Sequence, residues 1–165
     1  MSGYDVRQLI PRSIGHFWSE SYGQIYPALK QMTKSGLVEK KTQRQKGRPD
    51  RNVYSLTKAG REELREWLGM PVEEPVPRFV LMLKMFFGAH AAKGVNREHV
   101  AAFLTTHERA LKVYAATEKQ LKKDAARDPQ LPYWLMTLNF GRHRSKAFVK
   151  WAKETLLELE RLEGG

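Results

Sequence analysis

The chain of 165 residues contains no cysteine, which excludes disulfides and thiolate metal sites and fits a reducing compartment. Its five histidines do not have the spacing of metal ligands, so we expect no metal ion. Glycine-rich phosphate loops and the Gly-x-Ser-x-Gly nucleophile element are also missing. Carboxylates are scattered over charged helix faces. We therefore predict that the protein is not an enzyme and needs no cofactor.

Long apolar runs are scarce as well. The most apolar stretch, residues 79–87, is far shorter than the roughly 20 residues that span a bilayer. The first residues lack the basic and then apolar pattern of a signal peptide. We therefore expect a cytoplasmic protein with no membrane partner.

Acidic side chains are outnumbered: 18 Asp and Glu face 29 Lys and Arg, which leaves a net charge of +11. Such an excess favours polyanionic partners, namely DNA, RNA or an anionic membrane surface. The excess is densest at residues 39–51, where six cations accompany two anions. An alternating apolar stretch typical of a β-strand follows at residues 53–56.

Capping residues predict two helices at the start of the chain. Ser2 and Asp5 form one capping box, which opens a short helix that we expect to end at Pro11. Ser21 and Gln24 form a second, which opens a helix over residues 21–35. Gly36 then serves as a helix stop.

A hairpin and a third helix follow. We expect strands over residues 37–44 and 52–56, joined by a turn at 45–51. Thr57 is the expected N-cap of a helix over 58–68. The inner face of this helix is expected to carry Leu64, Trp67 and Leu68. Helix, helix, hairpin and helix in this order form the winged-helix arrangement.

Three prolines between residues 71 and 77 mark a change to an all-helical region. Helices are expected over 76–93, over 97–127 with Asn96 as cap, and over 133–162. Long amphipathic helices without partners usually pair with a second copy of the chain. The fold class is therefore mainly α with a small β-hairpin wing. It comprises an N-terminal winged helix-turn-helix domain in residues 1–70 and a C-terminal helical dimerisation domain in residues 71–165.

The second helix and the hairpin are the parts that a winged helix presents to double-stranded DNA. A helix or a two-stranded ribbon fits the major groove, where Gln24 can read adenine. Tyr26 can contact DNA or pack inward beside Pro27. The cations of the hairpin suit the phosphate backbone or the minor groove. The predicted DNA-binding residues are Ser21, Tyr22, Gln24, Tyr26, Lys30 and Lys34 in the helix and Lys46, Arg48 and Arg51 in the hairpin.

Four segments resemble the PadR family of bacterial transcriptional regulators: SGYDV, GQIYPALKQMTKSGLVEK, GRPDRNVYSLTKAGREEL and FVLMLKMFFG. The segments IGHFW and PDR are similar to its virulence-activator branch. The resemblance implies a homodimer that binds a palindromic operator, with the C-terminal helices forming the dimer interface. Some members release DNA when a small aromatic effector binds. Family members also have a further helix before the position of Ser2, so we expect an upstream segment or another element to supply it.

The C-terminal region offers a second candidate site with two interpretations. Aromatic residues could line an effector pocket between subunits or pack as core: His107, Tyr114, Trp134, Phe140 and Trp151. The basic segment 142–146 is either a solvated face or an extra phosphate contact. Besides a sequence-specific regulator, two functions stay open. One is a dimeric interaction or ligand-binding protein of the same descent that has lost DNA binding, and the other is a nonspecific binder of RNA or membranes.

Overall fold

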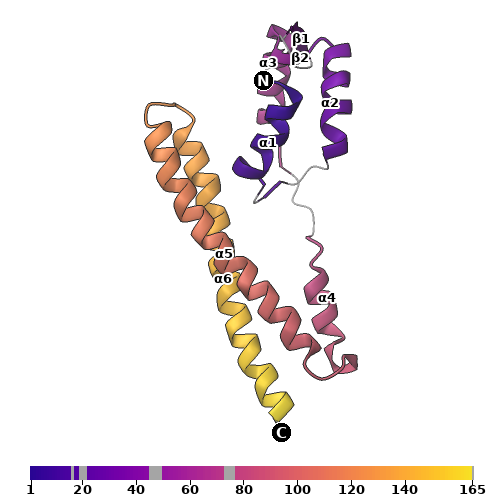
Figure 1. Ribbon diagram of the computed structural model, residues 1–165, viewed down its shortest axis with the longest axis vertical. Helices are drawn as coiled ribbons and strands as arrows, with labels where there is room; N and C mark the ends of the chain where they lie inside the picture. The colour runs from indigo at the N-terminus through magenta and orange to yellow at the C-terminus, as the bar shows by residue number, and fades with distance from the viewer. Residues whose placement is uncertain (16, 19–21, 45–49, 73–76, 165) are drawn as a thin grey trace. The chain divides into compact units, whose positions relative to one another are not determined.

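The computed structural model describes residues 1–15, 17–18, 22–44, 50–72 and 77–164, which fold as two compact units, Met1–Pro75 and Val76–Gly165. The first unit contains helices α1 (Gly3–Ser13), α2 (Tyr22–Lys34) and α3 (Lys58–Gly69) and strands β1 (Val38–Gln43) and β2 (Arg51–Leu56). The second contains α4 (Val80–Phe86), the short 3-10 helix η1 (Gly88–His90), α5 (Val95–Asp124) and α6 (Leu131–Gly164) (Figure 1). The mainly helical fold with a two-stranded hairpin is confirmed.

Main-chain hydrogen bonds tie the start of the chain to the hairpin. The Met1 ammonium donates to the Tyr54 carbonyl at 2.9 Å, and the Tyr54 N–H donates back to the Met1 carbonyl at 2.8 Å. Ser2 forms an antiparallel bridge with Val53. The predicted capping box follows at once, because the Ser2 hydroxyl accepts from the Asp5 N–H and the Asp5 carboxylate accepts from the Ser2 N–H. The beginning of α1 is therefore fixed beside β2.

The junction of α2 with β1 forms the predicted helix stop. Gly36 has a positive φ of 71°, which suits glycine because other residues meet steric strain there. The Leu37 N–H donates to the Met32 carbonyl and the Gly36 N–H to the Thr33 carbonyl, as in a Schellman motif. This geometry turns the chain from α2 directly into β1.

The start of α3 docks on the same junction. The Thr57 hydroxyl accepts from the Gly60 N–H, which confirms Thr57 as the N-cap, and it also donates to the Gly36 carbonyl at 2.7 Å. Gly60 is buried, and a Cβ atom there would lie 2.0 Å from the Leu37 carbonyl oxygen. No side chain fits at that position, so the approach of α3 to β1 depends on this glycine.

Two expectations for the first unit are wrong. The helix α1 does not end at Pro11 but continues to Ser13, and the N–H groups of Ile14 and Gly15 both donate to the Ile10 carbonyl to close its last turn. The expected inner face of α3 is exposed: Leu64, Trp67 and Leu68 are 44%, 62% and 68% accessible. The contacts of α3 with the hairpin lie in its first turn. Leu64, Trp67 and Leu68 are therefore not buried by other described residues.

The second unit is a long helical hairpin. Helices α5 and α6 run antiparallel side by side, and α4 lies beside the start of α5 (Figure 1). Val100, Ala152 and Leu159 form a buried cluster near the start of α5, with Phe103 and Trp151 packed around them. The 3-4 spacing predicted for the inner face of α5 is confirmed, since its positions from Val100 to Leu121 are buried or half-buried.

The ends of these helices differ from the expected ones. Helix α4 covers only residues 80–86 of the expected 76–93, and α5 begins after Gly94, which takes a φ of 85°. Asn96 is not the cap. It lies inside α5, and its side-chain amide donates to the Gly88 carbonyl at 2.9 Å. This tertiary contact accounts for the asparagine and joins η1 to α5.

Candidate nucleic-acid interface

The outer face of α2 is polar, with no acidic side chain. Ile25 is buried and Leu29 and Met32 are half-buried, which fixes the inner face of the helix. The outer face of the helix consists of exposed residues: Gly23, Gln24, Tyr26, Pro27, Ala28, Lys30, Gln31 and Lys34. Three of the predicted contacts, Gln24, Lys30 and Lys34, are thus free to meet a partner along one helix.

The side chain of Tyr26 both packs against α1 and is exposed to solvent. Its side chain is 53% exposed, yet its ring lies against Gly3, where a Cβ atom would come within 2.7 Å of the ring carbon Cε1. Tyr26 therefore helps to position α2 against α1 and still offers its other edge to a partner.

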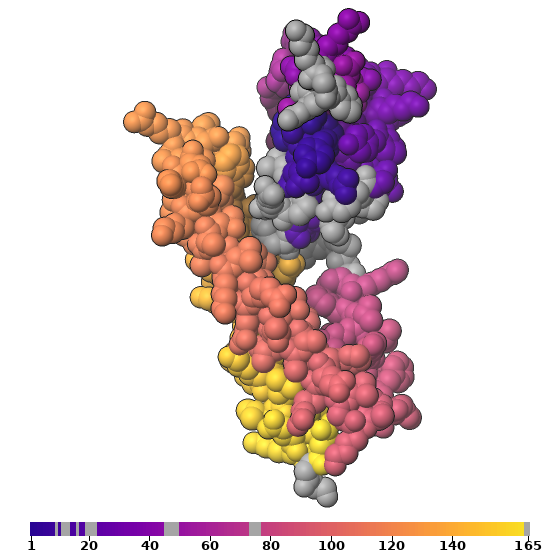
Figure 2. All heavy atoms as spheres, viewed as in Figure 1, coloured from indigo at the N-terminus to yellow at the C-terminus, as the bar shows by residue number. Residues whose placement is uncertain are grey.

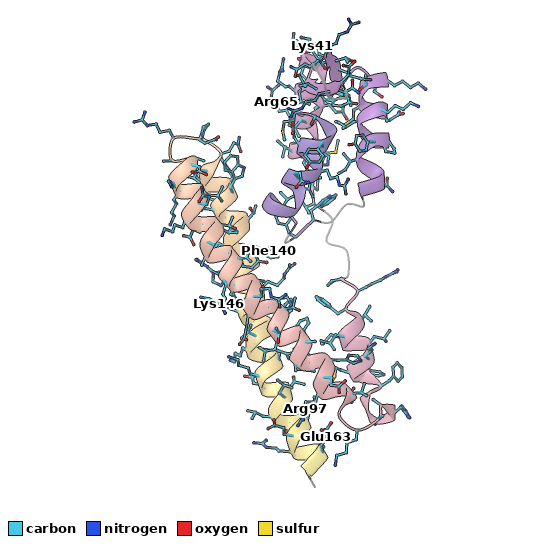
Figure 3. All side chains as sticks on the ribbon, in the orientation of Figure 1. Lys41, Arg65, Arg97, Phe140, Lys146 and Glu163 are labelled. Carbon is cyan, nitrogen blue, oxygen red and sulfur yellow. The ribbon has the colours of Figure 1, made fainter. Side chains whose placement is uncertain are left out.

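The hairpin presents its charge on both faces. Lys40 lies opposite Tyr54 in the register and Lys41 lies opposite Val53, so the two lysines point to opposite sides of the ribbon. All of β1 beyond Val38 is exposed. Lys41 is 3.5 Å from Glu39, and an exposed pair of this kind contributes little to stability. Figure 3 labels Lys41 of β1 and Arg65 of α3 in the first unit.

Arg51 has a structural partner that the sequence did not reveal. Its Nη2 atom lies 2.5 Å from Oδ2 of Asp5, so an ion pair joins β2 to the first turn of α1. The backbone N–H of Ser2, together with the Arg51 guanidinium, lowers the pKa of the Asp5 carboxyl. Arg51 therefore stabilises the position of α1 as well as adding positive charge to the hairpin.

The sequence reasoning missed several exposed groups. Gln31 lies seven residues, or two helical turns, after Gln24, and this spacing would have placed both amides on one side of α2. Lys40, Lys41 and Arg44 are exposed along β1 and its end. Four predicted contacts have side chains outside the described part of the structure: Ser21, Tyr22, Lys46 and Arg48.

The proposed effector residues lie in two places of the second unit. His107 and Trp151 belong to an aromatic cluster with Phe103 and Phe148, in which His107 is 4.4 Å from Phe103 and 4.8 Å from Phe148 between ring centroids. Burial, and then the positive charge of Arg144, lowers the pKa of His107. Its Nδ1 atom lies 3.2 Å from the hydroxyl of the buried Ser145. This arrangement favours a neutral imidazole.

Tyr114 lies further along the hairpin, beside a cleft of about 350 Å³. Arg142 reaches this cleft, where it donates to Glu118 at 2.9 Å and to Asn139 at 2.7 Å. Lys122, followed by Arg142, lowers the pKa of Glu118. Trp134 and Phe140 are exposed on the outside of α6. One chain therefore does not bring all five aromatic candidates around a single cavity.

Other chemistry is not evident in the described ranges. Among these residues, no three His, Cys, Asp or Glu side chains gather as the ligands of a metal ion would. Within the same ranges, no helix combines the length and the apolar character needed to cross a membrane.

Two family models match the chain, one over each compact unit. Residues 1–66 match the "Transcriptional regulator PadR-like family", and residues 77–160 match "Virulence activator alpha C-term". The negative transcriptional regulator PadR of Bacillus subtilis is 27% identical over 168 residues, which cover 98% of this chain and 91% of that protein.

Solved structures agree with these matches. The crystal structure of Bacillus subtilis PadR in complex with operator DNA has a TM-score of 0.80 and 25% identity, covering 96% of this chain and 91% of that one. The same protein in complex with p-coumaric acid has a TM-score of 0.73 and 26% identity, covering 97% and 90%. The Vibrio cholerae virulence activator AphA has a TM-score of 0.74 and 28% identity, covering 98% and 90%.

Proposed function

The chain belongs to the PadR-like family of transcriptional regulators, in its virulence-activator branch, and we propose that it binds a palindromic operator as a homodimer. Helix α2 enters the major groove, with Gln24 and Gln31 at the base edges and Lys30 and Lys34 at phosphates. The observation that carries this assignment is the exposed, acid-free outer face of α2 beside a hairpin of exposed cations.

The hairpin supplies mainly electrostatic affinity in this proposal. Its cations lie over the backbone or in the adjacent minor groove: Lys40, Lys41, Arg44, Lys46, Arg48 and Arg51. Contacts of this kind hold specific and unrelated duplexes alike and weaken with salt. Since a bacterial regulator of this kind works on the chromosome, we place it in the cytoplasm.

The exposed apolar surface of the second unit supports the dimer. The segment of α4 is apolar at every position except Lys84, and a helix of this kind is usually buried. Yet Val80, Leu83 and Phe86 are exposed, Phe86 to 81%. Large exposed apolar patches mark interaction sites. We assign residues 1–70 to DNA binding and residues 71–165 to dimerisation, with α4 covered by the partner chain.

A small aromatic acid is the effector that we propose for the cleft beside Tyr114. Arg142 binds its carboxylate in place of Glu118, and Tyr114 with Leu138 contacts its aromatic ring. The titration of the protein with p-coumaric acid, a ligand of its Bacillus relative, tests this by release of bound DNA. No release by this or related phenolic acids would remove the effector from the proposal.

The direct test of DNA binding is a titration against the promoter DNA of the protein's own gene, with an unrelated duplex of equal length as control. We expect tight binding to the promoter and binding to the control that disappears as salt rises. Equal affinity for both would favour a nonspecific binder. No affinity for either would favour a relative that has kept only its interaction role.

A further inference from the structure

One face of α5 carries a line of unpaired cations. Val100 and Tyr114 are buried and His107 is half-buried, which identifies the face of α5 that packs on α6. The positions opposite recur at 3-4 spacing in the second half of the helix, and they are Arg109, Lys112, Ala116, Lys119 and Lys123. All five are exposed, and the positions on this line include no acid. We call Arg109, Lys112, Lys119 and Lys123 the basic stripe.

Five other cations of this unit, among them Arg161, have acidic partners. Lys122 and Arg142 both bind Glu118, Lys153 lies 3.3 Å from Glu108, and Lys150 lies 3.9 Å from Glu154. The basic stripe has neither an ion pair nor a side-chain hydrogen bond among the described residues. The outer surface of α5 faces the reader over much of its length in Figure 2. The stripe is therefore open to a partner.

The charge of the second unit is concentrated around the stripe. Residues 109–150 contain ten Lys and Arg and three Asp and Glu, for a net charge of +7. Residues 77–108 and 151–164, at the other end of the helical hairpin, contain six of each and are neutral together. Figure 3 shows that neutral end at Arg97 and Glu163. A charge confined to one end produces a local field that attracts a polyanion.

We propose that the basic stripe is a second DNA-contact surface, which binds phosphates in addition to those contacted by the winged helix. The inference rests on the proposed function, because DNA is already the partner of the first unit. Lys112, Lys119 and Lys123 are lysines, and lysine is depleted from protein interfaces. The stripe also lacks the large apolar anchors of such interfaces. A second copy of the stripe is excluded as partner, since like charges would face each other.

The length of the stripe fits a duplex. Fourteen residues separate Arg109 from Lys123, which corresponds to roughly 21 Å along a helix. Each strand of B-DNA presents one phosphate per roughly 3.4 Å of its axis, so phosphates recur along a duplex more closely than the cations of the stripe do along α5. A contact made only with phosphates adds affinity that does not depend on the base sequence.

The test neutralises the stripe and compares salt dependence. The stripe variant is Lys112→Gln, Lys119→Gln and Lys123→Gln in the full chain. The control variant, Lys93→Gln, Arg97→Gln and Arg161→Gln, removes the same charge from the neutral end. Binding is measured over a salt series with a long promoter duplex and an unrelated duplex of equal length. Circular dichroism and sedimentation confirm that each variant keeps the helical content and assembly state of the parent protein.

The stripe variant should lose about 0.9 units of salt slope for each lost phosphate contact, and therefore roughly two to three units per chain. The loss should be equal on both duplexes, so the preference for the promoter should remain. A stripe variant whose slopes match those of the control variant would overturn the inference while the proposed function stands. A parent protein with no preference for its promoter would instead contradict the proposed function. Loss of binding to anionic lipid vesicles, with DNA affinity intact, would also overturn the inference.

Discussion

The two units of this chain are stabilised in different ways. In the first, few side chains are buried, and main-chain contacts fix the geometry: the Ser2 cap, the turn at Gly36 and the approach of Gly60 to Leu37. In the second, side chains form the core, with Val100 and Ala152 fully buried and an aromatic cluster around Phe103. Main-chain contacts leave the polar side chains of α2 exposed, whereas the packed helices of the second unit still expose apolar side chains of α4.

The two units also differ in what their exposed elements carry. The exposed cations of the first unit lie on β1 and α2. Few side chains of these two elements are buried, so most of them are exposed to solvent. The second unit exposes large apolar groups at both α4 and α6, among them Phe86 and Leu162. In our proposal the first unit meets DNA through α2 and the hairpin, while the second meets a partner chain through α4 and DNA through the basic stripe. Each of the following experiments alters one side of this contrast.

The largest effect should come from charges placed on α4. In the double variant Leu83→Glu and Phe86→Glu, two carboxylates replace apolar side chains that are exposed in one chain and that we place in the dimer interface. Sedimentation should show a monomer, and operator affinity should fall about 100-fold or more, since two linked half-site contacts become independent. Val113→Glu, at an exposed position of α5, is the control. If only the Val113→Glu protein were a monomer, the dimer interface would lie on α5 and not on α4.

The Gly60→Ala variant should destabilise the first unit through a single methyl group. The added Cβ would lie 2.0 Å from the Leu37 carbonyl oxygen, and backbone cannot move aside as a flexible side chain can. We expect a loss of about 2–3 kcal/mol in the free energy of unfolding. Chemical denaturation measures it. Gly69→Ala in the same helix is the matched control, because nothing lies within 4 Å of its Cβ position. Equal free energies of unfolding for the two variants would contradict the close approach of Gly60 to the Leu37 carbonyl.

Gln24→Ala separates base recognition from phosphate contact. Specific affinity should fall by roughly 1–3 kcal/mol, with affinity for an unrelated duplex nearly unchanged, because a bidentate contact to adenine is lost. Gln31→Ala tests in the same way the amide that the sequence reasoning missed. Titrations of both duplexes give the answer, and an equal loss on both would remove Gln24 from base recognition.

The smallest effect should be a pH dependence from His107. Burial lowers its pKa in the folded chain, so below about pH 6.5 the unfolded chain binds a proton that the folded chain does not. Stability should therefore be complete above pH 6.5 and decline as the pH falls, by less than the limit of about 1.4 kcal/mol per pH unit for one proton. His107→Gln should weaken this decline. His143→Gln, at an exposed position, should leave it unchanged. A parallel decline in all three proteins would exclude His107 as the cause.

The sequence predicted those features that depend on neighbouring residues. Ser2, Gly36 and Thr57 were placed correctly because capping and helix termination are local chemistry. The inner face of α5 was predicted for the same reason, since a 3-4 spacing fixes it within one helix.

Features that depend on distant residues were not predictable in this way. Asparagine is a common N-cap residue, but the side-chain amide of Asn96 donates to the Gly88 carbonyl instead. The residue that precedes the first turn of α5 is Gly94. The ion pair between Asp5 and Arg51 joins residues that are 46 positions apart. The spacing of apolar residues in α3 predicts that they share one face of the helix. It does not show whether another part of the molecule buries that face, because burial depends on residues that are distant in the sequence.

The central claim is that a dimer places two α2 helices on one operator, and a footprint of the protein on its own promoter tests it most directly. We expect two protected half-sites related by a two-fold axis, with centres about 10–10.5 base pairs apart or a multiple of that. Protection should disappear with the Leu83→Glu and Phe86→Glu variant at concentrations that saturate the parent protein. A single unpaired protected site, or protection that does not differ between the promoter and unrelated DNA, would contradict binding of one operator by two α2 helices.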